Sequence, residues 1–118
     1  PMNIADISKS GEIFRLNNNN VQWKSNTKIK DGNYKIGIRP HNITTYKEGN
    51  NSVEINGKVL ISELSGSESL IHFTKGDLNW VSLSNGIQQK NIGEETKLYM
   101  NVDEFLYFDQ NNRLVDNG

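Results

Sequence analysis

Residues Val53–Leu64, with the sequence VEINGKVLISEL, decide the fold of this chain. Apolar and polar side chains alternate along much of this stretch, a pattern typical of a β-strand with one buried face. The Asn56-Gly57 pair within it has two interpretations. It forms a type I′ hairpin turn, because both residues tolerate positive φ, or it is a glycine bulge that bends one long strand, as the corners of small barrels require. Both interpretations predict β-structure.

Short strand-like runs recur on both sides of this stretch, whereas helical periodicity is nearly absent. No window of about 11 residues keeps apolar side chains at helical spacing without crossing a glycine or a polar turn cluster. The sequence therefore predicts an all-β fold, a small OB-like barrel of short strands with little or no helix. The other expected strands are Glu12–Leu16, Val21–Lys24, Tyr34–Arg39, Leu70–Thr74, Leu78–Leu83, Thr96–Val102, Phe105–Phe108 and Arg113–Val115.

The alternation within these strands also predicts which side chains point inward. A barrel of this size is filled by its own side chains, so we expect no large ligand cavity. The expected inward residues are Ile36, Ile38, Val59, Ile61, Leu70, Leu83, Leu98 and Met100, with Phe73, Trp80, Phe105 and Phe108 as larger fillers.

Length and composition exclude several classes of protein. The chain has 118 residues, which suits one domain, and a net charge of −1. It contains no cysteine, so disulfides, thiolate metal sites and cysteine nucleophiles are excluded. No apolar run approaches the ~20 residues of a membrane-spanning helix. The near-neutral charge without a basic run argues against a strong nucleic-acid binder.

No catalytic constellation is visible in the sequence. His41 and His72 lack a second ligand at a familiar metal-site spacing, and no P-loop motif occurs. Glu63 and Glu68 flank Ser65-Gly66-Ser67 and are conceivable as a glycosidase pair, but a solvated hairpin end is the preferred interpretation. The sequence therefore predicts no catalytic, cofactor-binding or metal site.

The most specific segment is Tyr34–Pro40, with the sequence YKIGIRP. It resembles the GIRPE signature of the C-terminal regulatory domain, called a TOBE domain, in ATP-binding subunits of bacterial carbohydrate ABC importers such as the maltose and glycerol-3-phosphate importers. His41 stands where that family usually has Glu. Further segments resemble the family in its order: Pro1-Met2-Asn3, Lys58–Glu68, Ile92-Gly93-Glu94 and Leu106–Asp109.

This resemblance implies a domain organisation. Residues 1–118 would form a single C-terminal regulatory domain of TOBE or MOP type, with 1–32 as leading hairpin strands and 33–118 as the main barrel. The N-terminal ATPase domain would lie outside this chain, and the start at Pro1 is interpreted as the end of that domain. The fragment would be no enzyme and would hold no cofactor, whereas the parent protein would bind ATP and Mg²⁺.

The resemblance also implies partners and a location. The domain would contact a second copy of itself in a homodimer, would reach the transmembrane subunits through the missing ATPase domain, and would receive a regulatory protein. No nucleic acid is expected as a partner. The parent protein would be cytoplasmic and peripheral to the cell membrane, and would power import of a sugar or related solute.

Eight residues are candidates for structural or interface roles. Gly37 would let a neighbouring backbone or a bulky ring approach closely. Arg39 would make a bidentate bond to a carboxylate such as Glu63, with contact to a partner as the alternative role. Phe108 is either a core plug or an aromatic anchor at a subunit contact. The full set is Gly37, Arg39, Pro40, Glu63, Gly66, Glu68, Phe108 and Asp109.

Two other functions remain open at this point. The serines of Ser65–Ser69 are the only candidates for a small-oxyanion site of the molybdate type, which needs hydroxyls and backbone amides. An OB-type barrel also binds single-stranded nucleic acid when exposed aromatic rings line a basic groove. The aromatic residues of this chain are expected mainly in core packing and interfaces.

Overall fold

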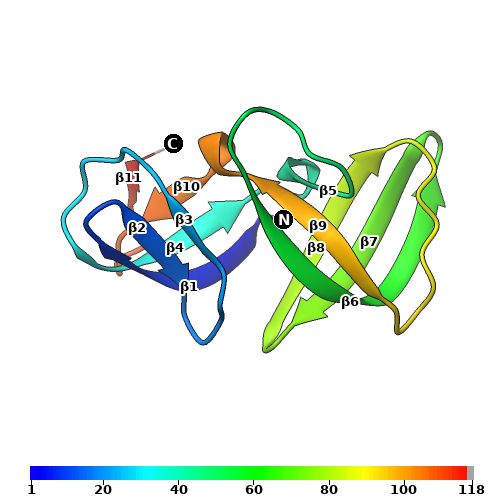
Figure 1. Ribbon diagram of the computed structural model, residues 1–118, viewed down its shortest axis with the longest axis horizontal. Helices are drawn as coiled ribbons and strands as arrows, with labels where there is room; N and C mark the ends of the chain where they lie inside the picture. The colour runs from blue at the N-terminus through cyan, green and yellow to red at the C-terminus, as the bar shows by residue number, and fades with distance from the viewer. Residues whose placement is uncertain (117–118) are drawn as a thin grey trace.

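The computed structural model describes residues 1–116, which fold into two antiparallel sheets (Figure 1). Sheet A has the strand order β11-β10-β4-β1-β2-β3 and sheet B has the order β5-β9-β6-β7-β8. The expected all-β fold with little helix is confirmed, and sheet B curls into a nearly closed five-stranded barrel consistent with a small OB-like fold.

The strands of sheet A are β1 (Asn3–Ser10), β2 (Ile13–Leu16), β3 (Gln22–Lys24), β4 (Gly32–Ile38), β10 (Leu106–Phe108) and β11 (Leu114–Asp116). The strands of sheet B are β5 (Ile43–Thr44), β6 (Ser52–Ser65), β7 (Glu68–Lys75), β8 (Leu78–Asn85) and β9 (Glu95–Asn101). The helical structure among the described residues is limited to two short 3₁₀ turns, η1 (Pro40–Asn42) and η2 (Val102–Glu104). Sheet B therefore comes from one continuous part of the chain, and sheet A from the parts on either side of it.

The two sheets lie side by side along the long axis of the molecule (Figure 1). The side chain of Asn3 joins them. Asn3 of β1 is buried, and its side-chain Nδ2 donates to the Val81 carbonyl at 2.9 Å. Its Oδ1 accepts from the Val81 amide at 2.8 Å. Trp80 Nε1 donates to the Ile4 carbonyl at 3.2 Å beside this pair. The Asn3 amide therefore satisfies the edge of β8 as a neighbouring strand would.

Side chains close the barrel of sheet B where no backbone ladder does. The Ser82 hydroxyl donates to the Ile43 carbonyl at 2.5 Å. The Ser84 hydroxyl accepts from the Thr45 amide at 3.1 Å, and the Tyr46 hydroxyl accepts from the Asn85 amide at 3.3 Å. These bonds join β8 to residues 43–46, and they explain why both serines are buried, since buried polar groups need partners.

The long strand predicted at Val53–Leu64 exists, and it runs straight through Asn56-Gly57. Both residues pair with β9, opposite Lys97 and Thr96, without a shift in register, so the hairpin interpretation is wrong. The bulge lies further along, where the register shifts between Val59 and Ile61. Glycine is needed at position 57 for another reason, because a Cβ there would lie 2.3 Å from Cδ2 of Phe73.

Most of the predicted core is confirmed, with corrections on sheet B and at Phe108. Ile61 is exposed, because the bulge turns it to the outer face of β6. Leu70 and Leu83 are only half-buried, because Ser69, Ile71, Ser82 and Ser84 take the inward positions of β7 and β8. Phe108 is half-buried outside the core. The confirmed inward residues are Ile36, Ile38, Val59, Phe73, Trp80, Leu98, Met100 and Phe105.

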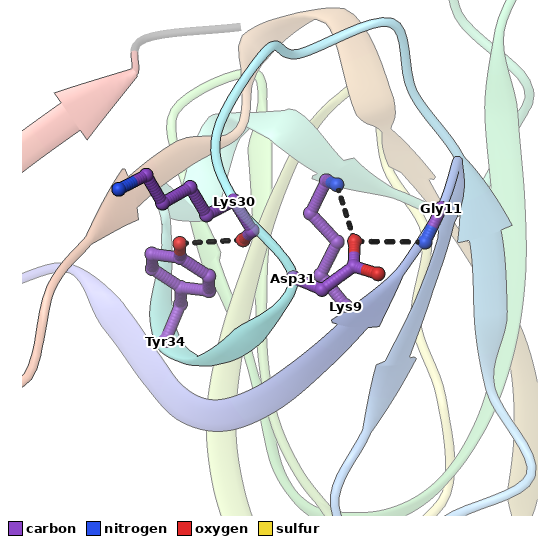
Figure 2. Close-up of polar contacts among 5 residues, drawn as sticks. All are labelled: Lys9, Gly11, Lys30, Asp31 and Tyr34. Atoms are coloured by element: carbon purple, nitrogen blue, oxygen red, sulfur yellow. Dashed lines mark hydrogen bonds and ion pairs between the residues drawn. The ribbon is translucent and has the colours of Figure 1, made fainter.

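Sheet A contains a strand that the sequence did not predict, and an ion pair supports its far end. The buried side chains of β1 include Asn3 and Lys9, so its alternation carries little apolar signal. Lys9 Nζ donates to Asp31 Oδ1 at 3.0 Å, and the Gly11 amide donates to the same oxygen at 2.9 Å (Figure 2). The Tyr34 hydroxyl donates to the Lys30 carbonyl at 2.6 Å, which holds the loop that carries Asp31 (Figure 2).

This cluster makes a testable prediction about acid stability. The hydrogen bond from Lys9 and then that from the Gly11 amide hold the pKa of Asp31 below its ordinary value. Asp31 therefore stabilises the fold above its unfolded pKa of about 3.9, and this stabilisation is lost as the pH falls through its lower folded pKa. We expect Asp31→Asn to lower the melting temperature at neutral pH, with the gap closing toward about pH 2. A gap that stays constant across this range would contradict the role of the Asp31 charge.

Candidate interaction face

Residues 1–116 contain no arrangement that suggests catalysis. No group of three or more His, Asp or Glu side chains lies where it would hold a metal ion in this part of the chain. None of the described helical segments has the length and apolar character needed to cross a membrane. A hollow of about 610 Å³ is lined by polar and charged side chains such as Glu12, Lys24 and Asp103. Both histidines lie outside its lining, so no imidazole base serves it.

The outer surface of sheet A is different, because apolar side chains gather there around Gly37. A Cβ at position 37 would lie 2.7 Å from Met2 Sδ and 2.9 Å from Phe108 Cε2. The expected close approach of a bulky ring to Gly37 is therefore confirmed. Next to this contact is a groove of about 170 Å³, lined by Met2, Ile4, Lys35, Phe108 and Asn112.

We call this surface the Gly37 face. Strand register places its members together, with Ile4 and Leu106 on either side of Gly37, and Asp6 and Phe108 on either side of Lys35. Ile4 is 53% exposed on β1, directly beside Gly37. Leu114, opposite Phe108 on β11, is 54% exposed at its edge. The face consists of Met2, Ile4, Asp6, Lys35, Gly37, Leu106, Phe108 and Leu114.

Of the other predicted site residues, Arg39 and Pro40 lie at one end of this face. Arg39 follows β4 directly and is exposed, and Pro40 starts η1. The predicted bond from Arg39 to Glu63 is not formed among the described residues. Arg39 lies just after β4 of sheet A, whereas Glu63 is exposed on the outer side of β6 in sheet B, so this expectation is corrected.

Asp109 has a structural role next to the face. Its Oδ1 accepts from the backbone amides of Arg113 at 2.9 Å and Asn111 at 2.8 Å. Its Oδ2 lies 3.5 Å from Arg113 Nε. The amide of Arg113 above all holds the pKa of Asp109 below its ordinary value. The carboxylate therefore shapes the turn between β10 and β11, which presents Leu114 beside Phe108.

Glu63, Gly66 and Glu68 lie elsewhere, around the β6–β7 hairpin. Gly66 adopts a φ of +61° in the turn, where a side chain would be strained. Glu68 lies opposite Ser65, and Glu63 lies opposite Leu70, so the strand register does not bring the two carboxylates together as a pair. The structure thus separates these residues from Gly37, Arg39, Pro40, Phe108 and Asp109.

The serines predicted as candidates for a small-oxyanion site do not form one cluster of free hydroxyl groups. The Ser69 hydroxyl donates to the Gly86 carbonyl at 2.7 Å and accepts from the Gln88 amide at 2.6 Å. Ser69 is fully buried, whereas Ser65 and Ser67 are exposed near the turn. No observation on the described residues favours an oxyanion site at this hairpin.

Sequence reasoning missed the β1 members of the face. Ile4 and Asp6 belong to the Gly37 face because β1 pairs with β4, and β1 was not predicted. The only signal in the sequence is short, since Ala5 and Ile7 alternate with the polar Asp6 and Ser8.

Comparison with known proteins gives one distant relationship. No protein-family model matches the chain. It is 24% identical over 106 residues to the multiple sugar-binding transport ATP-binding protein MsmK of Streptococcus mutans serotype c. The alignment covers 87% of this chain and 28% of MsmK, so the chain spans less than a third of this relative's length. This chain is therefore a distant homologue of part of a sugar-transport ATP-binding protein.

Proposed function

We propose that this chain is the C-terminal regulatory domain, of TOBE type, of the ATP-binding subunit of an ABC importer for a sugar or related solute. One observation carries the proposal: nearly the whole chain aligns with 28% of a sugar-transport ATP-binding protein. A small OB-like barrel and the Tyr34–Pro40 motif on and just after β4 support it.

In this role the domain does no chemistry. It holds two ATP-binding subunits together through a two-fold contact while their catalytic domains open and close, and it receives a regulatory protein. ATP and Mg²⁺ bind the ATPase domain, which also contacts the transmembrane subunits at the cytoplasmic face of the membrane. A non-catalytic contact role suits a chain whose described residues present an apolar face.

The proposal is tested on the gene and on the protein. We expect the same reading frame to encode a P-loop ATPase upstream of Pro1. The product of the full frame should release phosphate from Mg-ATP, whereas the 118-residue chain alone should release none above a blank. A frame without a P-loop, or phosphate release by the chain alone, would contradict the proposal.

A further inference from the structure

The Gly37 face has the layout of a protein interface. Its centre is apolar, with Ile4 and Leu106 on either side of Gly37 and Phe108 packed over that glycine. Its rim is charged, with Asp6 and Lys35 next to the apolar centre. An apolar core with a polar rim is the common anatomy of specific protein contacts.

The charges on and beside the rim are of both signs, and two of them have no partner among residues 1–116. Asp6 lies directly opposite Lys35 in the β1–β4 register. The Lys35 ammonium nevertheless donates to Asn112 Oδ1 at 3.2 Å, and no described residue pairs with the Asp6 carboxylate. Arg39, at the end of β4, is also exposed and unpaired within residues 1–116.

A face with adjacent positive and negative charges is complementary to itself after a two-fold rotation. The rotation places Asp6 of one copy against Lys35 of the other, twice, and closes the two apolar centres on each other. The groove of about 170 Å³ beside Phe108 has the size of one apolar side chain, and Ile4 and Leu114 protrude next to it. A surface that binds a polyanion would instead carry a rim of positive charges only.

From this geometry we infer that the Gly37 face is the two-fold contact between two copies of this chain, with reciprocal Asp6–Lys35 pairs at its rim. The inference deepens the proposed function, on which it rests, by assigning the subunit contact to named residues. Other exposed apolar side chains belong to the sheet B part of the chain: Leu60, Ile61 and Leu64 lie on β6, and Ile87 and Ile92 lie in the loop between β8 and β9.

A matched pair of isoleucine variants tests the location of the contact. Ile4→Asp places a charge in the apolar centre, and we expect it to raise the dimer dissociation constant, measured by sedimentation velocity, by about tenfold or more. Ile92→Asp is the control, since Ile92 is also exposed (77%) but lies outside the face. A wild-type chain that stays monomeric, or a dimer that both variants weaken equally, would overturn the inference.

Charge reversal tests the two-fold pairing. Asp6→Lys and Lys35→Asp alone each juxtapose like charges across the contact, so each should weaken the dimer by about tenfold. The double variant exchanges both charges and should recover most of the lost affinity. Melting curves of all three show whether each remains folded, because the two residues are also neighbours within one chain. A double variant no better than the folded single variants would overturn the pairing.

The lack of cysteine allows a third measurement. An equimolar mixture of Asp6→Cys and Lys35→Cys chains should form a mixed disulfide under mild oxidation, with little cross-linking in a mixture of Asp6→Cys and Ile92→Cys chains. Equal cross-linking in the two mixtures would overturn the proposed contact. These results are independent of the gene test: an upstream P-loop with a monomeric chain rejects only the contact, whereas a dimer without that P-loop rejects only the proposed function.

Discussion

Replacing Gly57 by alanine is expected to lower the free energy of unfolding by about 3 kcal/mol, at the upper end of the usual cost of overpacking a core. The new methyl group would lie 2.3 Å from Cδ2 and 2.9 Å from Cγ of Phe73. Phe73 is fully buried, so its ring has no free volume into which it can move. Urea denaturation of the variant and the wild type measures the difference.

Gly37→Ala is the matched control for this prediction. Its methyl group would also make short contacts, but with the ends of Met2 and Phe108, which are only half-buried on the outer face. Because these side chains can turn aside, a smaller loss of stability is expected. Adding Phe73→Leu to Gly57→Ala should recover part of the stability by removing the ring. A Gly57→Ala variant within about 0.5 kcal/mol of wild type would contradict the packing argument.

Asn3→Ala is expected to lower the free energy of unfolding by about 2–3 kcal/mol, because it removes two hydrogen bonds at once. The Val81 amide and carbonyl would both lose the partner that they have in the Asn3 side chain. The loss falls where β1 of sheet A meets β8 of sheet B, so the docking of the sheets is weakened rather than either sheet alone. Chemical denaturation gives the size of the effect.

Asn79→Ala is the control for the joint between the sheets. Asn79 is exposed on β8, the same strand as Val81, and no described residue bonds to its side chain. Its replacement should change stability by no more than about 0.5 kcal/mol. Hydrogen exchange adds a local measurement, since the Val81 amide should exchange faster in Asn3→Ala than in Asn79→Ala. Equal stability of the two variants would show that Asn3 does not join the sheets.

Sequence reasoning succeeded where one face of a strand is clearly apolar. Ile36 and Ile38 alternate with polar residues or glycine, and β4 forms where it was predicted. The motif that contains them led directly to Gly37. The pattern was insufficient in β7, where apolar residues occur on both faces of the segment Leu70-Ile71-His72-Phe73. The sequence therefore did not show that Ile71, and not Leu70, points inward.

Other features depend on partners that are distant in the sequence. Ser82 and Ser84 point inward because they bond to residues 43–45, which no local pattern reveals. Asn3 is buried because its side chain bonds to the backbone amide and carbonyl of Val81. β1 and its contribution to the Gly37 face were missed because its buried positions include the polar Asn3 and Lys9. The expected bond between Arg39 and Glu63 is not formed among the described residues, since Arg39 follows β4 of sheet A and Glu63 lies on β6 of sheet B.

The order of strands in the two sheets has a consequence for the newly made chain. Sheet B is built from residues 43–101, so all its strands are present before β10 is synthesised. Sheet A begins with β1–β4 but needs β10, whose buried Tyr107 accepts a hydrogen bond from Trp23 at 3.0 Å across 84 positions. During synthesis the indole of Trp23 therefore has no Tyr107 hydroxyl to bond to at a stage when the strands of sheet B can already pair with one another. A chain that ends before residue 105 and is held outside the ribosome exit tunnel by a C-terminal linker should protect sheet B from proteases and leave sheet A open to them.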